Sequence, residues 1–220
     1  MNSKILSMTR EIHYQDKSIN YGIAHTRLKR ILDLVGGISG KKVLDIGCAR
    51  GYVGSRIKAL GNYVVGVDIA ESAVKEAEKV LDKTYVFDLE GSWPDLGNKF
   101  DLAILPEILE HVFDPVEVLK KVYSALGDGG EIIITTPNLL LWTSRTKIMF
   151  GKFEYTDQGL MDFGHIRFFT YKYLNKVLKD SGFKIEKENH IIFPGKLTRF
   201  LKSWPSLFAT QFIIKARKNI

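Results

Sequence analysis

The stretch Val43-Leu44-Asp45-Ile46-Gly47-Cys48-Ala49-Arg50-Gly51 decides the fold of this chain. Residues 42–46 are typical of a short apolar strand, and the glycines after them mark a turn before a helix expected over 52–60. Because glycine has no Cβ, such a turn lets a ligand approach the backbone closely. The stretch therefore predicts a ligand site at the end of this strand.

The alternation of strand and helix continues along the chain. Further strands are expected over 63–67, 84–87, 100–105 and 131–135, and further helices over 71–81 and 115–126. Asp114 as N-cap and Pro115 at the first helical position open the last of these helices. Strands separated by helices favour a doubly wound, mostly parallel α/β sheet with helices on both faces. Ligands of such sheets bind beyond the carboxyl ends of the strands.

The alternation stops after Pro137. Residues 138–169 are expected to form an aromatic, loop-rich insertion, which we interpret as a lid over the acceptor. A helix over 171–179 and two strands over 183–187 and 207–216 follow. We expect a single domain over 1–220, with a helical N-terminal lead-in over 1–40.

The spacing of the glycine-rich turn excludes two common phosphate-binding motifs. A dinucleotide fingerprint GxGxxG that begins at Gly47 needs glycines at positions 49 and 52, which are Ala49 and Tyr52. A P-loop ends in Gly-Lys-Ser/Thr, whereas this chain has Gly54-Ser55-Arg56. The ligand is therefore expected to be bound without either motif.

Residues 43–51 resemble motif I of the class I S-adenosylmethionine-dependent methyltransferases, VLDIGCGxG, with Ala49 in place of the middle glycine. The resemblance covers residues 41–136, and more loosely the chain to Lys218. It implies a Rossmann-like fold with a seven-stranded sheet, whose last strand is antiparallel and inserted beside the sixth. It also implies S-adenosylmethionine as the cofactor.

Carboxylates end three successive strands of the predicted sheet. The resemblance implies that Asp68 accepts both ribose hydroxyls, and that Asp88 contacts the adenine amino group while Leu89 packs on the ring. Asp45 is expected beside the amino and sulfonium groups of the cofactor. The expected cofactor-binding residues are Asp45, Gly47, Cys48, Ala49, Gly51, Asp68, Ile69, Asp88, Leu89, Leu105 and Glu107.

An ExxEH segment after the fourth strand and a later histidine mark the acceptor side. This pattern resembles the O-methyltransferases of coenzyme Q biosynthesis and the small-RNA 2′-O-methyltransferases, where the resemblance implies a divalent metal. Three interpretations stay open: a metal site, a general base at His111 or His165, or purely structural roles. The candidate metal ligands are Glu107, Glu110, His111 and His165, and the candidate catalytic residues are His111 and His165.

The basic excess of the chain belongs to its last third. Residues 1–140 carry 17 Lys and Arg against 19 Asp and Glu, whereas residues 141–220 carry 15 against 6. This third is expected to face an anionic acceptor, a nucleic acid or a lipid surface, unless it is only a solvated basic face. Cys48 alone forms no intrachain disulfide, and no apolar run is long enough for a signal peptide or a membrane span. These features indicate a cytoplasmic protein.

The most economical hypothesis is an S-adenosylmethionine-dependent methyltransferase that acts on an oxygen of a small-molecule acceptor, in the manner of the coenzyme Q biosynthetic group. One alternative is an RNA 2′-O-methyltransferase that uses the basic last third. The other is a non-catalytic S-adenosylmethionine-binding domain. Methyl transfer itself asks little of the protein beyond alignment and removal of a proton, so the cofactor residues are easier to recognise than the catalytic ones.

Overall fold

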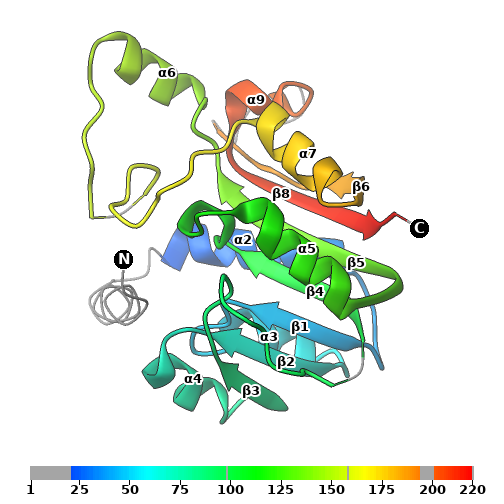
Figure 1. The fold of residues 1–220 in the computed structure, drawn as a ribbon. Coiled ribbons are helices and arrows are strands. Elements are labelled where there is room, and N and C mark those ends of the chain that lie inside the picture. Colours follow the sequence, from blue (N-terminus) through cyan, green and yellow to red (C-terminus); the bar gives the residue numbers. More distant parts are fainter. Residues whose placement is uncertain (1–20, 98, 158, 194–200, 220) are drawn as a thin grey trace.

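One mixed sheet runs through the centre of the molecule, with helices on both faces (Figure 1). The computed structural model describes residues 21–97, 99–157, 159–193 and 201–219, so residues 1–20 of the expected lead-in lie outside the described residues. The strands are β1 (Lys42–Ile46), β2 (Tyr63–Asp68), β3 (Lys83–Val86), β4 (Phe100–Pro106), β5 (Leu126–Pro137), β6 (Phe183–Glu188), β7 (Ile191–Ile192) and β8 (Ala209–Lys218). The helices are α2 (Tyr21–Val35), α3 (Tyr52–Lys58), α4 (Glu71–Ala77), the 3₁₀ helix η1 (Leu109–His111), α5 (Pro115–Ala125), α6 (Trp142–Met149), α7 (Tyr171–Asp180) and α9 (Pro205–Phe208).

The strand order is β3-β2-β1-β4-β5-β8-β6, and β7 pairs with β8 beside this path. Strands β1 to β5 are parallel, whereas β8 is antiparallel to both β5 and β6. The expected antiparallel last strand, inserted beside the sixth, is thus confirmed. The sheet has eight strands rather than seven, because the short β7 adds its own pairing to β8.

Alternation along the strands divides the core into two layers. Leu44 and Ile46 of β1 point to the face covered by α5 and α7, where they join a cluster with Leu119 and Leu178. Val43 points to the opposite face and packs with residues of α2 and α3. Burial on both faces explains why the central strands are almost continuously apolar.

Helix α5 begins as its sequence predicts. Oδ1 of Asp114 accepts hydrogen bonds from the backbone N–H groups of Val116 and Glu117, both at 3.0 Å. Pro115 occupies the first turn, where the missing N–H costs no helical hydrogen bond. Helix α3 follows the first glycine turn and strand β2 comes next, as expected. Helix α4 is also present, but it ends at Ala77 rather than at residue 81.

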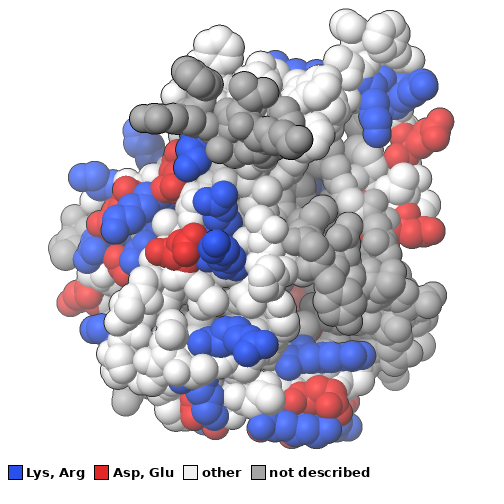
Figure 2. Space-filling view, turned by 180° about the vertical axis from the view of Figure 1, so that it is seen from behind, with Lys and Arg blue, Asp and Glu red and all other residues white. Residues whose placement is uncertain are grey.

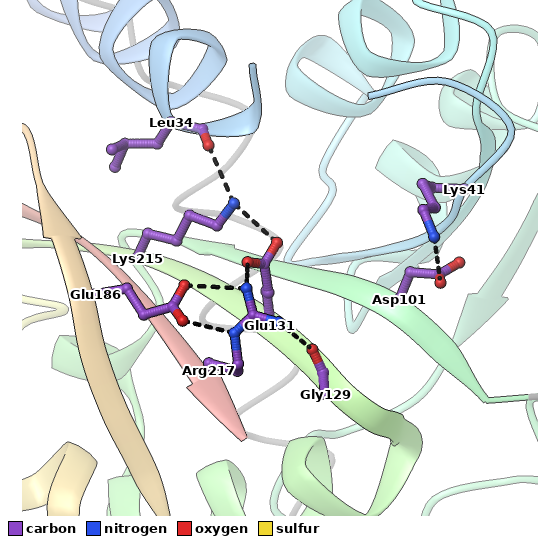
Figure 3. Close-up of polar contacts among 8 residues, drawn as sticks. All are labelled: Leu34, Lys41, Asp101, Gly129, Glu131, Glu186, Lys215 and Arg217. Atoms are coloured by element: carbon purple, nitrogen blue, oxygen red, sulfur yellow. Dashed lines mark hydrogen bonds and ion pairs between the residues drawn. The ribbon is translucent and has the colours of Figure 1, made fainter. Parts of the chain in front are cut away.

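A buried ion-pair network ties α2 to the sheet (Figure 3). Nζ of Lys215 on β8 lies 2.8 Å from Oε2 of Glu131 on β5 and 3.4 Å from the carbonyl oxygen of Leu34 near the end of α2. Arg217 contacts Glu131 and Glu186 from the same strand. These two cations of the basic last third therefore serve internal pairing.

The charged surface is mixed rather than one basic area. On the face that Figure 2 shows, Lys and Arg lie among Asp, Glu and uncharged residues. Lys176 of α7 pairs with Asp180 one turn later, so this cation of the last third also has an acidic partner within the protein. Among the described helices, none is both long and apolar enough to cross a membrane.

The insertion differs from the loop-rich segment that the sequence predicts, because it contains helix α6. No residue of α6 is buried, so its sequence has no apolar stripe at helical spacing that would indicate it. In Figure 1, α6 stands away from the sheet, and a long connection leads from it to α7.

Candidate functional site

The glycine-rich turn after β1 depends on two left-handed backbone positions. Gly47 has φ 69°, and a Cβ at this position would lie 2.0 Å from Cδ1 of Ile108. Gly51 has φ 78° and precedes the first residue of α3. Ala49 between them also has a positive φ, 47°, although a Cβ disfavours this region. The turn therefore keeps the shape expected from its glycines, and Ala49 bears the strain of the one departure.

Asp68, at the end of β2, fixes this turn through its side chain. Its Oδ2 accepts a hydrogen bond from the Ala49 N–H at 2.9 Å, and its Oδ1 accepts one from the Ala70 N–H at 3.0 Å. The carboxylate thus joins the first turn to the start of α4. Its position at the carboxyl end of β2 is compatible with the predicted ribose contact, which stays a prediction.

Asp45 differs from its expected role. The residue is completely buried, and its Oδ2 accepts a hydrogen bond from the Gly54 N–H in the first turn of α3 at 2.9 Å. Its Oδ1 is buried without a hydrogen-bond partner among the described residues. Burial raises the pKa of Asp45 to about 7, and the nearby Asp68 adds to the shift. In this conformation the Asp45 carboxylate is buried and positions α3 beneath the turn, and its expected place beside the cofactor stays a prediction.

The other expected cofactor residues divide by accessibility. Leu105 is fully buried in the core, and Cys48 is nearly so, with burial raising the pKa of its thiol. Neither side chain is open to solvent, so a cofactor contact at these two positions would use backbone atoms, and it stays a prediction. Gly51 is also buried, whereas five positions at the carboxyl edge of the sheet are half-buried: Gly47, Ala49, Ile69, Asp88 and Leu89.

Asp88 begins a turn of its own after β3. Its Oδ1 accepts a hydrogen bond from the Glu90 N–H at 3.0 Å, and its carbonyl oxygen accepts one from the Gly91 N–H at 3.0 Å. This Asx turn orients the carboxylate at the third strand end, where the resemblance implies the adenine contact. That contact stays a prediction.

Glu107 points away from the position that its motif suggests. Its φ is 57°, and its side chain turns toward β5, β8 and α2. Oε1 accepts a hydrogen bond from the Thr135 hydroxyl at 2.7 Å, and Oε2 accepts one from Nε2 of Gln211 at 2.8 Å. Nη2 of Arg27 lies 3.7 Å from Oε2. Its carboxylate is thus already occupied, and the structure does not bring Glu107 into the predicted metal site.

Glu110, His111 and His165 do come together. One ligand atom from each of the three residues lies within 4.8 Å of the other two, and the ring centroids of the two histidines are 4.8 Å apart. We call these residues the Glu-His-His trio. Glu110 is buried, and neither of its carboxylate oxygens has a hydrogen bond of ordinary geometry to a described residue, although the Thr136 hydroxyl lies near enough to lower its pKa against the larger effect of burial. Burial and the nearby Glu107 raise the pKa of Glu110 well above its ordinary value.

Backbone carbonyls of the insertion orient both histidines. Nδ1 of His111 donates to the carbonyl oxygen of Gly164 at 2.8 Å, and Nδ1 of His165 donates to that of Leu160 at 2.9 Å. A carbonyl oxygen can only accept, so each Nδ1 carries a proton, and in the neutral ring Nε2 then has the lone pair. Such carbonyl contacts commonly orient histidines that bind metal ions.

The insertion is anchored where it returns to the trio. The backbone N–H groups of Ile166 and Arg167 both donate to the carbonyl oxygen of Glu110, at 2.9 and 3.1 Å. The guanidinium group of Arg167 donates to the carbonyl oxygen of Phe113. These bonds hold His165 beside η1, although the two histidines lie far apart in the sequence.

Sequence reasoning did not identify the residues that support the site. Arg27, Thr135 and Gln211 hold Glu107, and Thr136 lines the enclosed space beside Glu110 and His165. Thr135 and Thr136 follow the apolar run of β5 at its carboxyl end, so the strand-end rule could have indicated them. No comparable signal marks Arg27 or Gln211.

Comparisons with known proteins identify the family and the fold of the chain. The family described as "Methyltransferase domain" matches residues 20–188. The chain is 36% identical over 118 residues to a ubiquinone biosynthesis O-methyltransferase from Idiomarina loihiensis, covering 51% of this chain and 49% of that protein. It is 36% identical over 115 residues to a tRNA U34 carboxymethyltransferase from Campylobacter hominis, covering 50% of this chain and 39% of that protein.

The chain spans about half the length of the curated relatives it matches. Its fold resembles that of magnesium protoporphyrin IX methyltransferase from Synechocystis PCC 6803 with bound SAH. The TM-score is 0.65 at 20% identity, covering 99% of this chain and 95% of the other. The family match spans most of the chain, and the strand order and the glycine turn agree with it. The chain therefore belongs to the methyltransferase domain family, within the class I S-adenosylmethionine-dependent methyltransferases.

Proposed function

We propose that this protein transfers a methyl group from S-adenosylmethionine to an oxygen of a small-molecule acceptor, and that the Glu-His-His trio holds a divalent metal ion at the acceptor side. The observation that carries the proposal is the paired orientation of His111 and His165. Each donates from Nδ1 to a backbone carbonyl, so the lone pair of each neutral ring is on Nε2, and one ligand atom of each ring lies within 4.8 Å of a carboxylate oxygen of Glu110.

The donor set fits such an ion. One carboxylate and two imidazoles suit borderline divalent ions such as Mn²⁺ or Zn²⁺, and a buried carboxylate without a partner is costly unless something neutralises it. When bound, the ion would supply a positive charge that favours the ionised form of an acceptor hydroxyl. Glu107 would stay outside this set, because Thr135, Gln211 and Arg27 already engage its carboxylate.

The cofactor supplies an electrophilic methyl group on a sulfonium, so the acceptor oxygen needs alignment and loss of its proton. Asp68 and the turn after β1 shape the cofactor side of the sheet edge. Glu107 follows β4 at that edge, and Glu110 is close enough for the Glu107 charge to raise its pKa. With an ion held by Nε2 of both histidines, the trio would orient the acceptor hydroxyl and the charge of the ion would favour loss of its proton to solvent. Without an ion, Nε2 of a histidine would take up that proton.

A small-molecule acceptor is favoured over RNA by two considerations. Several cations of the basic last third are paired with acids, and on the face in Figure 2 the described Lys and Arg residues lie among acids and uncharged residues rather than in one basic track of the kind that nucleic-acid backbones need. The family relatives include an O-methyltransferase of ubiquinone biosynthesis and an enzyme named for tRNA. RNA therefore remains the comparison substrate in the test.

The test begins with calorimetric titration of S-adenosylmethionine into the protein, with Asp68→Ala as the variant expected to bind at least tenfold more weakly. Methyl transfer is then measured from labelled cofactor to a panel of catechols and other hydroxylated small molecules, with tRNA as the competing acceptor. Absence of cofactor binding by the unaltered protein would overturn the proposal.

The metal part has its own measurement. Chelator-treated protein is titrated with Mn²⁺, Zn²⁺ and Mg²⁺ by calorimetry, and His165→Ala is expected to abolish the high-affinity step. Methyl transfer by the chelated protein should recover when the preferred ion is restored. If chelation leaves transfer unchanged and no ion binds, the metal assignment is wrong, and a histidine base without metal is the remaining interpretation.

A further inference from the structure

We propose that the tip of the insertion, residues 142–155, docks on the surface of a lipid bilayer with anionic headgroups. The occupant is the interfacial region of the bilayer, and the association is peripheral. The proposal rests on exposure, shape and charge of this segment, and it does not depend on which reaction the protein catalyses.

Large apolar side chains are concentrated on the outside of the insertion. The two most exposed large apolar residues among those described, Met149 at 73% and Phe150 at 74%, follow each other at the end of α6. Exposed large apolar side chains continue through the rest of the insertion: Trp142, Ile148, Phe153, Tyr155, Phe163 and Ile166. Contiguous exposed apolar surface of this kind marks an interaction site more often than a solvated face.

The shape of the segment supports contact with a flat surface. Helix α6 has no buried residue, and it protrudes from the body of the molecule in Figure 1. Its base is held by a stack of Trp142 on Phe193, with ring centroids 6.5 Å apart, and by a hydrogen bond from Nε of Arg145 to the carbonyl oxygen of Leu140 at 2.7 Å. Beyond this base, Ile148, Met149 and Phe150 are exposed at the end of the helix.

The charges at the tip complement anionic lipid. Lys147 and Lys152 are exposed on either side of Met149 and Phe150, and neither forms an ion pair with a described residue. Glu154 is the single acid of residues 142–155. Lysines elsewhere on the surface are commonly paired, as Lys79 is with Glu76 and Lys120 with Glu117. Apolar side chains flanked by unpaired lysines match the boundary between acyl chains and anionic headgroups.

The insertion also connects its tip to the Glu-His-His trio. After the tip, the chain returns past Leu160 and Gly164, whose carbonyl oxygens accept the hydrogen bonds from His165 and His111. Docking at the tip would therefore engage the segment that also orients both histidines. This continuity favours a lipid surface near the acceptor side over an unrelated adhesive patch.

The experiment is co-sedimentation of the full chain with vesicles. One set contains phosphatidylcholine alone, and the other contains about 30% phosphatidylglycerol, so that the anionic contribution is separated from the apolar one. We expect binding to the anionic vesicles that weakens as salt rises. The variant Met149→Ser/Phe150→Ser should bind at least about tenfold more weakly, since two exposed apolar side chains no longer enter the interface.

Two further variants make the result specific. Leu60→Ser/Tyr63→Ser removes two exposed apolar side chains at the start of β2 and should leave vesicle binding unchanged. Lys147→Gln/Lys152→Gln should reduce binding to the anionic vesicles only. All altered residues are exposed, and circular dichroism checks that each variant keeps its fold.

A second measurement locates the contact. The native Cys48 is buried, so Phe150→Cys provides a single accessible thiol for an environment-sensitive dye. The emission of the labelled protein should shift to the blue on anionic vesicles. The proposal is overturned if the label does not respond, if the Met149 and Phe150 variant binds vesicles as the native protein does, or if that variant instead abolishes self-association or binding to tRNA.

Discussion

The cofactor side and the acceptor side occupy the same edge of the sheet, yet they are built in opposite ways. On the cofactor side, Asp45 and Asp68 accept hydrogen bonds from backbone N–H groups of the helices and turns that follow the strands. On the acceptor side, Glu110 is buried with no hydrogen-bond partner among the described residues, between two histidines from separate segments.

The difference indicates what each region is for. Carboxylates that bond to backbone groups stabilise the shape of a turn, and such shapes serve a ligand that hardly varies within a family. A buried carboxylate without a partner costs stability, and such sites persist where the cost serves binding or chemistry. The comparison predicts that substitutions on the two sides will affect stability and activity differently.

The largest effect is expected at Glu110. Glu110→Gln keeps the size of the side chain but removes the charge, so methyl transfer should fall by roughly a thousandfold or more, in the range typical of lost proton-transfer or metal-binding groups. Without added ions, the free energy of unfolding should rise by about 1 kcal/mol or more, because an unpaired buried carboxylate is removed. Single-turnover assays and urea denaturation measure the two effects.

The matched control is Glu117→Gln on the exposed face of α5, where a carboxylate pairs with Lys120. This exposed substitution should change neither activity nor stability by more than about 0.5 kcal/mol. If Glu110→Gln instead destabilises the protein and leaves transfer intact, Glu110 is a structural residue and the contrast between the two sides fails.

The next effect concerns Asp45 and the pH dependence of stability. Asp45 has an ordinary pKa of 3.8 and a pKa of about 7 in the folded protein, so the folded state holds its proton more tightly than the unfolded state. Stability should therefore fall as pH rises from about 4 to about 7, by roughly 4 kcal/mol in total, and change little from this cause outside that range. Asp45→Asn keeps an acceptor for the Gly54 N–H and should remove this loss.

The measurement is the free energy of unfolding of both proteins at intervals from pH 4 to pH 8. The two curves should meet near pH 4 and separate above it, with the variant more stable. Asp101→Asn is the control of opposite sign, because a hydrogen bond from the Lys42 N–H holds the pKa of Asp101 below its ordinary value. That variant should lose stability above the ordinary pKa of Asp101. Parallel curves for Asp45→Asn and the native protein would show that Asp45 is not strained by burial.

The orientation of Asp45 could have been predicted from alternation along β1. Leu44 and Ile46 face α5, so Asp45 must share the other face with Val43, under α3. The N-cap at Asp114 and the approximate positions of the parallel strands were predictable because they depend on local residue patterns, although β5 spans Leu126–Pro137 rather than the expected 131–135. The turn of Glu107 toward Arg27 was not, because it depends on a left-handed backbone position and on partners from α2 and β8. Helix α6 lacks a buried face and therefore lacks the periodicity that marks other helices.

The smallest effect separates the two left-handed positions of the site that are not glycine among the described residues, Ala49 on the cofactor side and Glu107 on the acceptor side. A left-handed conformation costs an L-residue roughly 1–2 kcal/mol, while glycine adds about 0.4–1 kcal/mol of unfolded-state entropy. Ala49→Gly should therefore raise the free energy of unfolding by about 0.5 kcal/mol. Glu107→Gly gains the same relief but loses the bonds to Thr135 and Gln211 and unpairs Arg27, so it should lower stability by about 1 kcal/mol or more. Urea denaturation of both variants tests the pair, and equal stabilisation by both would show that the contacts of Glu107 contribute nothing.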